Sequence, residues 1–120
     1  MKKIMVIDDE LDILDVLDRF LSRSGKYDVS TFSNPEVALQ KAKSETYDLI
    51  LSDIMMPQVS GMDILKEVKS HNNSTKVILM TAYSNKHKEE QSNEHGVDGY
   101  IYKPFQNLRV VEEAMNKVLN

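Results

Sequence analysis

The sequence predicts an α/β fold with a parallel sheet, and three observations support this prediction. Short apolar runs alternate along the chain with stretches whose apolar residues recur at helical spacing. The run Leu49-Ile50-Leu51 has no polar alternation, which is typical of a strand buried on both faces. This run stops at Asp53, and Pro57 and Gly61 follow, so the chain turns there. A carboxylate at the carboxyl end of such a strand lies where open α/β sheets bind ligands.

The first half of the chain alternates strand and helix. We expect a short strand from Ile4 to Ile7, then a helix with apolar residues between 13 and 21 that stops near Gly25. Residues 27–32 alternate in polarity, which indicates a strand nearer the edge of the sheet. The pair Asn34-Pro35 is typical of a helix start, with Asn34 as the cap and Pro35 in the first helical position.

The second half continues this alternation. Apolar residues at 64, 65 and 68 indicate a third helix, and residues 76–80 and 97–102 indicate two more strands. Apolar residues between 108 and 119 predict a last amphipathic helix. Strands that alternate with helices imply a parallel sheet with right-handed crossovers. No repeat, linker or low-complexity tract interrupts the pattern, so we expect one domain over residues 1–120.

The composition excludes several functions. The 120 residues are 41% hydrophobic and 28% charged, with a net charge of -4, so no general affinity for nucleic acid is expected. The absence of cysteine rules out disulfides and thiolate metal sites and fits a cytoplasmic protein. No apolar run reaches the roughly 18 residues of a membrane span. The run behind Met1-Lys2-Lys3 is too short for a signal peptide, so we expect no membrane insertion.

Polar side chains stand at the ends of four separate apolar runs. The first run ends at Asp8-Asp9, the central one at Asp53, the next at Thr81 and the last at Lys103. In a parallel sheet these ends lie along one edge, so we expect three carboxylates, a hydroxyl and an ammonium to converge. Taken singly, each residue has a simpler interpretation as a helix cap, a turn residue or a surface charge. The functional interpretation depends on their combination.

Three carboxylates in one place call for a cation. Two carboxylates ~4 Å apart repel by about 4 kcal/mol at an effective dielectric constant of ~20. All-oxygen ligands favour a hard cation such as Mg²⁺, which keeps several of its waters. A metal ion, a lysine and a hydroxyl around one carboxylate indicate a phosphoryl-transfer site, with Asp53 as the nucleophile.

Four motifs along the chain resemble those of the receiver domain of two-component response regulators. They are V-I-D-D-E at 6–10, D-I-M-M-P-Q-V-S-G at 53–61, M-T-A-Y at 80–83 and Y-I-Y-K-P-F at 100–105. The resemblance implies a flavodoxin-like, doubly wound fold of five parallel strands in the order 2-1-3-4-5 with five helices. Because the chain ends where the last helix should end, it resembles single-domain, chemotaxis-regulator-like receivers. A receiver excised from a longer regulator with an output domain would have the same sequence pattern.

The resemblance also implies metal ligands and partners. Asp53 would accept a phosphoryl group from a phosphohistidine on a histidine kinase or a phosphotransfer protein. Asp9 and Asp53 would bind Mg²⁺ directly, with Mn²⁺ as a substitute, while Asp8 binds through water and the backbone carbonyl of Met55 completes the ligands. We expect a monomer or weak dimer that regulates a protein partner and does not turn over an external substrate.

Three further residues receive roles from the same resemblance. Thr81 and Lys103 would bind the phosphoryl oxygens, and Tyr100 would be the switch aromatic that turns inward as Thr81 moves to the phosphate. The bond between Lys103 and Pro104 is cis in such domains. Met55 and Tyr83 would flank the phosphoryl group, and because neither orients water well, we expect slow self-dephosphorylation.

Two functions from other classes are less compatible with the sequence. A phosphohydrolase of the aspartyl-phosphate type carries D-x-D at the end of the first strand and a cap insertion, whereas this strand ends in Asp8-Asp9 and no insertion is long enough. A flavodoxin-like cofactor-binding module needs a Gly/Ser/Thr phosphate loop, where this chain has Asp8-Asp9-Glu10.

One segment departs from the family pattern. Residues 84–95, S-N-K-H-K-E-E-Q-S-N-E-H, contain no apolar residue, although helices in proteins owe most of their stability to a packed apolar face. The lysines precede the glutamates, which opposes the helix dipole. The sequence therefore predicts a short, frayed or mobile helix here, and we hypothesise that phosphorylation orders it.

Overall fold

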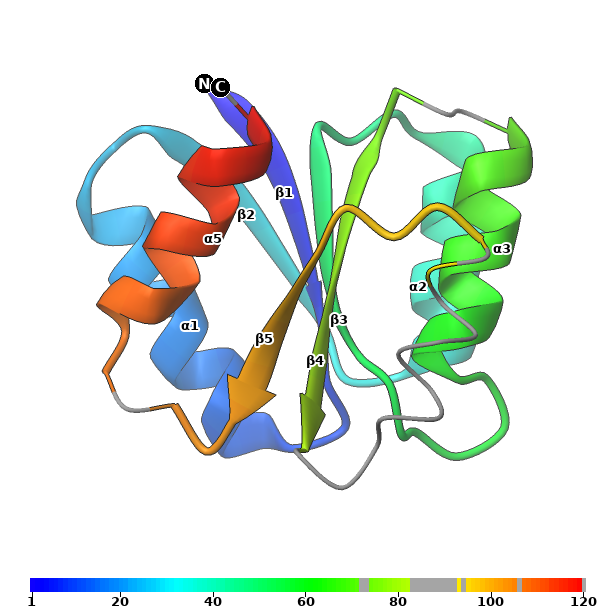
Figure 1. Ribbon diagram of the computed structural model, residues 1–120, viewed down its shortest axis with the longest axis horizontal. Coiled ribbons are helices and arrows are strands. Elements are labelled where there is room, and N and C mark those ends of the chain that lie inside the picture. Colours follow the sequence, from blue (N-terminus) through cyan, green and yellow to red (C-terminus); the bar gives the residue numbers. More distant parts are fainter. Residues whose placement is uncertain (72–73, 83–92, 94, 106, 120) are drawn as a thin grey trace.

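The chain forms a five-stranded parallel sheet with helices on both faces in the computed structural model (Figure 1), which describes residues 1–71, 74–82, 93, 95–105 and 107–119. The strand order is β2-β1-β3-β4-β5, which confirms the predicted fold and topology. The strands are β1 (Lys2–Ile7), β2 (Tyr27–Phe32), β3 (Leu49–Asp53), β4 (Lys76–Ala82) and β5 (Gly99–Lys103). The helices in this part of the chain are α1 (Leu11–Arg23), α2 (Pro35–Ser44), α3 (Gly61–His71) and α5 (Arg109–Leu119). The fifth helix implied by the resemblance falls on 84–95, and residues 83–92 and 94 lie outside the described residues.

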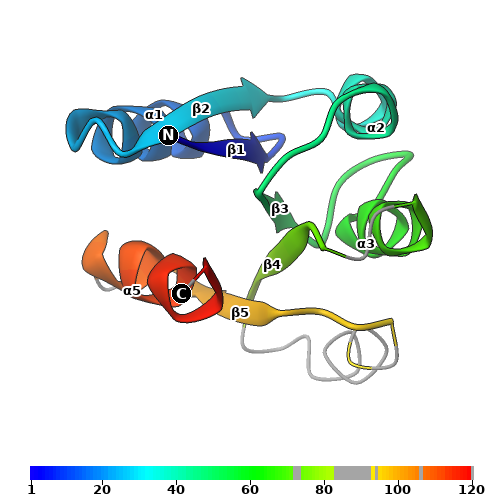
Figure 2. The same cartoon turned by 90° about the horizontal axis from the view of Figure 1, so that it is seen from above.

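The two faces of the sheet are covered by different helices (Figure 2). Helices α1 and α5 lie on one face, and α2 and α3 lie on the other. Strand β1 contributes side chains to the hydrophobic core on each face of the sheet. Ile4 and Val6 belong to the core beneath α1 and α5, whereas Met5 and Ile7 belong to the core beneath α2 and α3. All four side chains are fully buried. The apolar, non-alternating runs of the sequence are therefore strands between two helical layers.

The starts of two strands differ from the predicted ones. Strand β1 begins two residues early, because Lys2 and Lys3 extend the parallel pairing with β2. Strand β5 begins at Gly99, two residues later than the apolar pattern indicates. The reason lies in Asp98, whose Oδ2 accepts hydrogen bonds from the backbone N–H of Val77 (2.8 Å) and from Lys69 Nζ (2.7 Å). This carboxylate ties the start of β5 to β4 and α3.

The helix ends follow the expected chemistry. The Asn34 side chain accepts hydrogen bonds from the N–H groups of Glu36 and Val37, and Pro35 opens α2, as predicted. After α1, Gly25 has a φ of 71°, a conformation in which a residue without Cβ carries no steric cost. Each of the four helices has an acidic residue in its first turn and a basic residue in its last, which complements the helix dipole.

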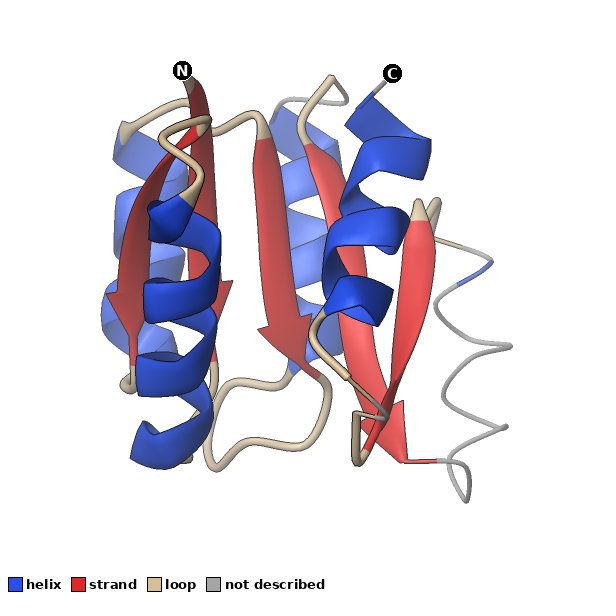
Figure 3. Ribbon diagram, turned by 90° about the vertical axis from the view of Figure 1, so that its left-hand side faces the viewer, coloured by secondary structure: helices blue, strands red, loops and turns tan. Residues whose placement is uncertain are grey.

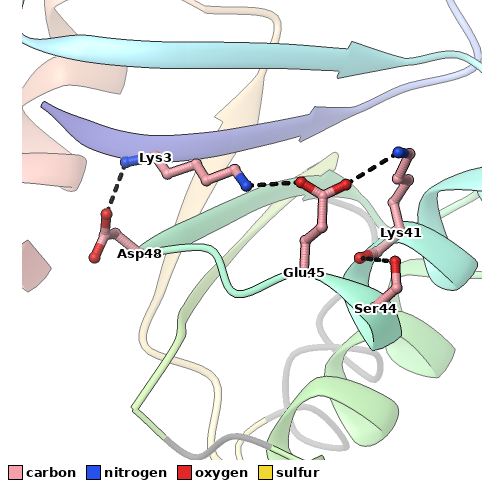
Figure 4. A network of polar contacts seen from close by, with 5 residues as sticks. All are labelled: Lys3, Lys41, Ser44, Glu45 and Asp48. Carbon is pink, nitrogen blue, oxygen red and sulfur yellow. Dashed lines mark hydrogen bonds and ion pairs between the residues drawn. The ribbon is translucent and has the colours of Figure 1, made fainter.

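A polar network holds the amino end of the sheet together (Figure 4). The Lys3 ammonium donates to Glu45 Oε1 at 2.7 Å, and Lys41 donates to Glu45 Oε2 at 3.0 Å. The backbone N–H of Lys3 donates to Asp48 Oδ2 at 2.7 Å. The network joins β1 to the end of α2 and to the connection that leads into β3.

The carboxyl ends of all five strands lie along the opposite edge (Figure 3). Strand β3 is the middle strand, between β1 and β4, so side chains at its end are flanked from both sides. Among the described helices, none combines the length and the apolar character that a membrane crossing requires.

Candidate functional site

Three aspartates converge at the carboxyl edge of the sheet. Asp8 follows β1 and Asp53 ends β3, and the two strands are paired in parallel up to Ile7 and Ser52. One carboxylate oxygen from each of Asp8, Asp9 and Asp53 lies within 4.8 Å of the other two. Asp8 and Asp53 are buried, whereas Asp9 is exposed. The side of the cluster formed by Asp8 and Asp53 is therefore buried, and the side formed by Asp9 faces solvent.

Lys103 reaches this cluster from the end of β5. Its ammonium lies 2.7 Å from Asp8 Oδ2, 3.4 Å from Asp53 Oδ1 and 3.9 Å from Glu10 Oε1. The sequence predicted the approach of Lys103 to the aspartates but gave no role to Glu10. Glu10 occupies the N-cap position of α1 without capping the helix through its side chain, and Asp8 Oδ1 instead accepts from its backbone N–H. The sequence feature that could have predicted the contact of Glu10 with Lys103 is an acidic residue at the N-cap position, directly after the two aspartates.

The environment of Asp53 disfavours its ionised form. Burial, followed by the negative charge of Asp8, raises the pKa of Asp53 from 3.8 to about 6, although Lys103 counteracts both effects. Burial lowers the pKa of Lys103, but its hydrogen bond to Asp8 and the charges of Asp53, Asp8 and Glu10 outweigh burial, and the pKa is raised overall. Lys103 is therefore a permanent cation beside a carboxyl group that titrates below neutral pH.

The donor set fits a hard divalent cation. Three carboxylates supply only oxygen, and one ammonium leaves part of their negative charge uncompensated. The exposed Asp9 leaves room for the waters that Mg²⁺ retains in protein sites. The oxygen-only chemistry and partial exposure are thus compatible with Mg²⁺.

The structure also describes Thr81, Met55 and Tyr100, which were predicted to belong to the site. Thr81 is buried near the end of β4, opposite Tyr102 of β5, and Met55, in the loop after β3, is 57% exposed. The Tyr100 hydroxyl donates to Asn93 Oδ1 at 2.9 Å, a contact that the sequence did not predict. The peptide bond between Lys103 and Pro104 is cis. Tyr83 lies outside the described residues.

The loop after Asp53 closes tightly against the strand. Ile54 N donates to the carbonyl of Met80 at 3.1 Å, and Gly61 N donates to the carbonyl of Ile54 at 2.9 Å. A Cβ on Gly61 would lie 2.4 Å from the carbonyl oxygen of Asp53, closer than any side chain can approach. Only glycine therefore allows α3 to begin directly beside the backbone of Asp53.

An open parallel sheet of order 2-1-3-4-5, with an acidic cluster and a lysine at its carboxyl edge, is the arrangement expected of a receiver domain. Residues 4–115 match the family model of the response regulator receiver domain. The chain belongs to this family, that of the receiver domains of two-component response regulators. Response regulators receive phosphate from histidine kinases and act on downstream targets, and receiver domains bind Mg²⁺ at an acidic pocket.

The relatives include longer regulators. The chain is 39% identical over 104 residues to the alkaline phosphatase synthesis transcriptional regulatory protein PhoP of Bacillus subtilis, covering 87% of this chain and 43% of that protein. It is 33% identical over 118 residues to the response regulator ArlR of Staphylococcus saprophyticus, covering 98% of this chain and 51% of that protein. The chain thus spans about half the length of these curated relatives.

Solved structures of similar proteins match the whole fold. The chemotaxis response regulator CheY4 of Vibrio cholerae superimposes with a TM-score of 0.89 at 29% identity, with 99% of each chain covered. The response regulator protein TrrA of Thermotoga maritima, in complex with Mg²⁺ and a beryllium fluoride, gives a TM-score of 0.86 at 36% identity. That comparison covers 99% of this chain and 100% of TrrA.

Proposed function

We propose that residues 1–120 form a receiver domain that is phosphorylated on Asp53 in a Mg²⁺-dependent reaction. One observation carries the proposal: Asp53 is buried at the end of the middle strand, between Asp8 and the ammonium of Lys103. With a pKa of about 6, Asp53 is mostly ionised at neutral pH, as a carboxylate nucleophile must be. Its oxygen forms a bond to phosphorus while the bond from phosphorus to the imidazole nitrogen of a phosphohistidine donor breaks.

The metal site would be formed by the aspartates and one carbonyl. Asp8, Asp9, Asp53 and the backbone carbonyl of Met55 are the protein groups that would hold Mg²⁺, or Mn²⁺ in its place. The bound cation would neutralise negative charge on the carboxylates and on the transferred phosphoryl group. The structure of TrrA with Mg²⁺ and a beryllium fluoride supports this assignment by similarity.

Lys103 and Thr81 would hold the phosphoryl oxygens. Lys103 lies close enough to Asp53, at 3.4 Å, to interact with oxygens attached to that carboxyl group. Thr81 supplies a hydroxyl near the end of the neighbouring strand β4. Tyr100 of β5 would be the switch aromatic that responds to a movement of Thr81, and its contact with Asn93 would change with it.

The output of the phosphorylated domain would be a changed affinity for another protein. We propose a histidine kinase or phosphotransfer protein as donor, an unidentified protein as downstream partner, and a cytoplasmic monomer or weak dimer. No turnover of an external substrate is proposed, because the phosphoryl group stays on Asp53 until water removes it. A second possibility is favoured by the relatives that are about twice as long: the chain is the receiver part of a regulator with an output domain. The full open reading frame distinguishes the two.

Labelling with acetyl phosphate and MgCl₂, followed by intact-mass measurement, tests the phosphoacceptor. Wild type should gain one phosphoryl group and Asp53→Asn none, because an amide cannot act as the nucleophile. Asp63→Asn, at an exposed aspartate of the first turn of α3, is the matched control and should be labelled like wild type. Labelling of Asp53→Asn, or an unlabelled wild-type chain, would refute the proposal.

A further inference from the structure

We propose that Ser52 is a positioning residue for the site, acting through the backbone of Asp53. Ser52 is fully buried, although its partners across β1 and β4 are the apolar residues Ile7 and Leu79. Its hydroxyl donates a hydrogen bond of 2.9 Å to the carbonyl oxygen of Asp53. A buried hydroxyl in an apolar layer needs such a partner, and here the partner is the backbone of the candidate phosphoacceptor.

The carbonyl of Asp53 has little freedom on any side. The pairing of β3 with β1 ends at Ser52, so on the β1 side this carbonyl lies one residue beyond the last paired position, although Asp53 still pairs with Met80 of β4. Gly61 packs so closely that an added Cβ would lie 2.4 Å from the same oxygen. The Ser52 hydroxyl therefore satisfies a carbonyl group that is enclosed at the junction of β3 and its loop.

These contacts fix the peptide unit that carries the site. The carbonyl of Asp53 is held by Ser52, and the N–H on the other end of the same peptide donates to the carbonyl of Met80 at 3.1 Å. Asp53 contributes the carbonyl end of this peptide unit, and the carbonyl of Met55 follows two residues later. Ser52 thus determines where both groups stand relative to Asp8 and Asp9. This inference rests on the proposed metal site and phosphoacceptor.

The test is Ser52→Ala, with Mg²⁺ itself as the probe. Titration with MgCl₂ followed by NMR should give a dissociation constant about tenfold above that of wild type, at the low end of the ~10–100-fold losses seen for groups that orient metal ligands. The spectroscopic signature is the carbonyl ¹³C resonance of Asp53 in the metal-free protein, which should shift when its hydrogen bond is lost. This shift verifies that the hydrogen bond to the Asp53 carbonyl is lost, and the Mg²⁺ affinity, compared with that of a matched control, separates positioning from a purely structural role.

Thr75→Val is the matched control at the other end of the sheet. The Thr75 hydroxyl is also buried and also donates to a backbone carbonyl, that of Tyr47, at 2.8 Å. This variant should lose stability while keeping the Mg²⁺ affinity and the Asp53 carbonyl resonance of wild type. Equal weakening of Mg²⁺ binding in both variants would overturn the positioning role.

The outcomes separate this inference from the proposed function. Unchanged Mg²⁺ affinity in Ser52→Ala, with normal binding and labelling of wild type, would overturn the role of Ser52 alone. Weaker Mg²⁺ binding in Ser52→Ala, with wild type that binds Mg²⁺ but is not labelled, would support positioning and refute the phosphoacceptor. Absence of Mg²⁺ binding by wild type would overturn both.

Discussion

The ammonium of Lys103 lies closer to Asp8 than to Asp53, at 2.7 Å against 3.4 Å. Asp8 is fully buried, and Lys103 is the cation that the structure places against it. A buried carboxylate without a cation would carry a large desolvation cost. Lys103 therefore has a structural role in addition to its proposed contact with the phosphoryl group, and the two roles can be measured separately.

Lys103→Met should destabilise the metal-free protein by roughly 3 kcal/mol, because it leaves Asp8 buried without its partner. Part of this loss should be recovered on addition of Mg²⁺, since a cation that binds the folded state stabilises it. Urea unfolding in EDTA and in MgCl₂ measures both effects. Lys26→Met, at an exposed lysine before β2, is the control and should change stability by no more than about 0.5 kcal/mol. Equal effects of the two substitutions would contradict the structural role.

Asp53→Asn should stabilise the metal-free protein at neutral pH. Because folding raises the pKa of Asp53 from 3.8 to about 6, its ionisation costs more in the folded than in the unfolded state. The free energy of unfolding of wild type therefore falls as the pH rises from about 4 to about 6. The variant has no carboxyl group at position 53, so its free energy of unfolding does not show this fall. The difference should be about 3 kcal/mol well above pH 6 and become small below pH 4, since the shift is about two units of pKa and each unit corresponds to ~1.4 kcal/mol. Urea unfolding across this range in EDTA measures it, and a difference independent of pH would contradict the assignment.

Met55→Asn should accelerate loss of the phosphoryl group severalfold. The Met55 side chain is exposed in the loop after Asp53, and a thioether orients an attacking water poorly, whereas an amide does so well. Protein labelled with acetyl phosphate and then freed of the donor gives the rate by intact mass over time. Met55→Leu keeps an apolar side chain of similar size and should retain the rate of wild type. An amide variant as slow as the leucine variant would count against this role.

Asn34→Ala should cost about 1 kcal/mol of stability by removing the cap of α2. The side chain accepts from Glu36 N at 2.9 Å and from Val37 N at 3.4 Å, and alanine leaves both groups to water. Ser33→Ala, at the preceding residue, is the comparison and should have a smaller effect. Chemical denaturation of both variants decides the matter, and equal stabilities would show that the cap contributes nothing measurable.

The convergence of the site could be predicted because parallel strands share one edge. Asp8, Asp53 and Lys103 each end a separate apolar run, and the structure brings them within hydrogen-bond or ion-pair distance. Apolar patterning alone predicted the parallel sheet, whereas the strand order 2-1-3-4-5 came from the resemblance and was confirmed. Patterning indicates which residues are buried, but it does not determine which neighbouring strands pair.

Contacts that depend on side-chain direction could not be predicted. The sequence indicated that Lys103 meets carboxylates, but not that it lies nearest Asp8, because the outcome depends on differences of less than an ångström. The hydrogen bond from Ser52 to the next residue's carbonyl depends on how β3 turns at its end. The start of β5 was placed too early because an apolar pattern carries no information about the bonds of Asp98.

The charges at the helix ends have a consequence for encounters over long distances. Each of the four described helices follows a strand and runs antiparallel to it, so their acidic first turns lie on the side of Asp53 and their basic last turns on the other. The side chains at these described helix ends therefore place negative charge on the side of Asp53, where they partly offset the positive ends of the helix dipoles. A donor protein with a positively charged docking face would be attracted by these acidic side chains, and its association rate would fall as the ionic strength rises.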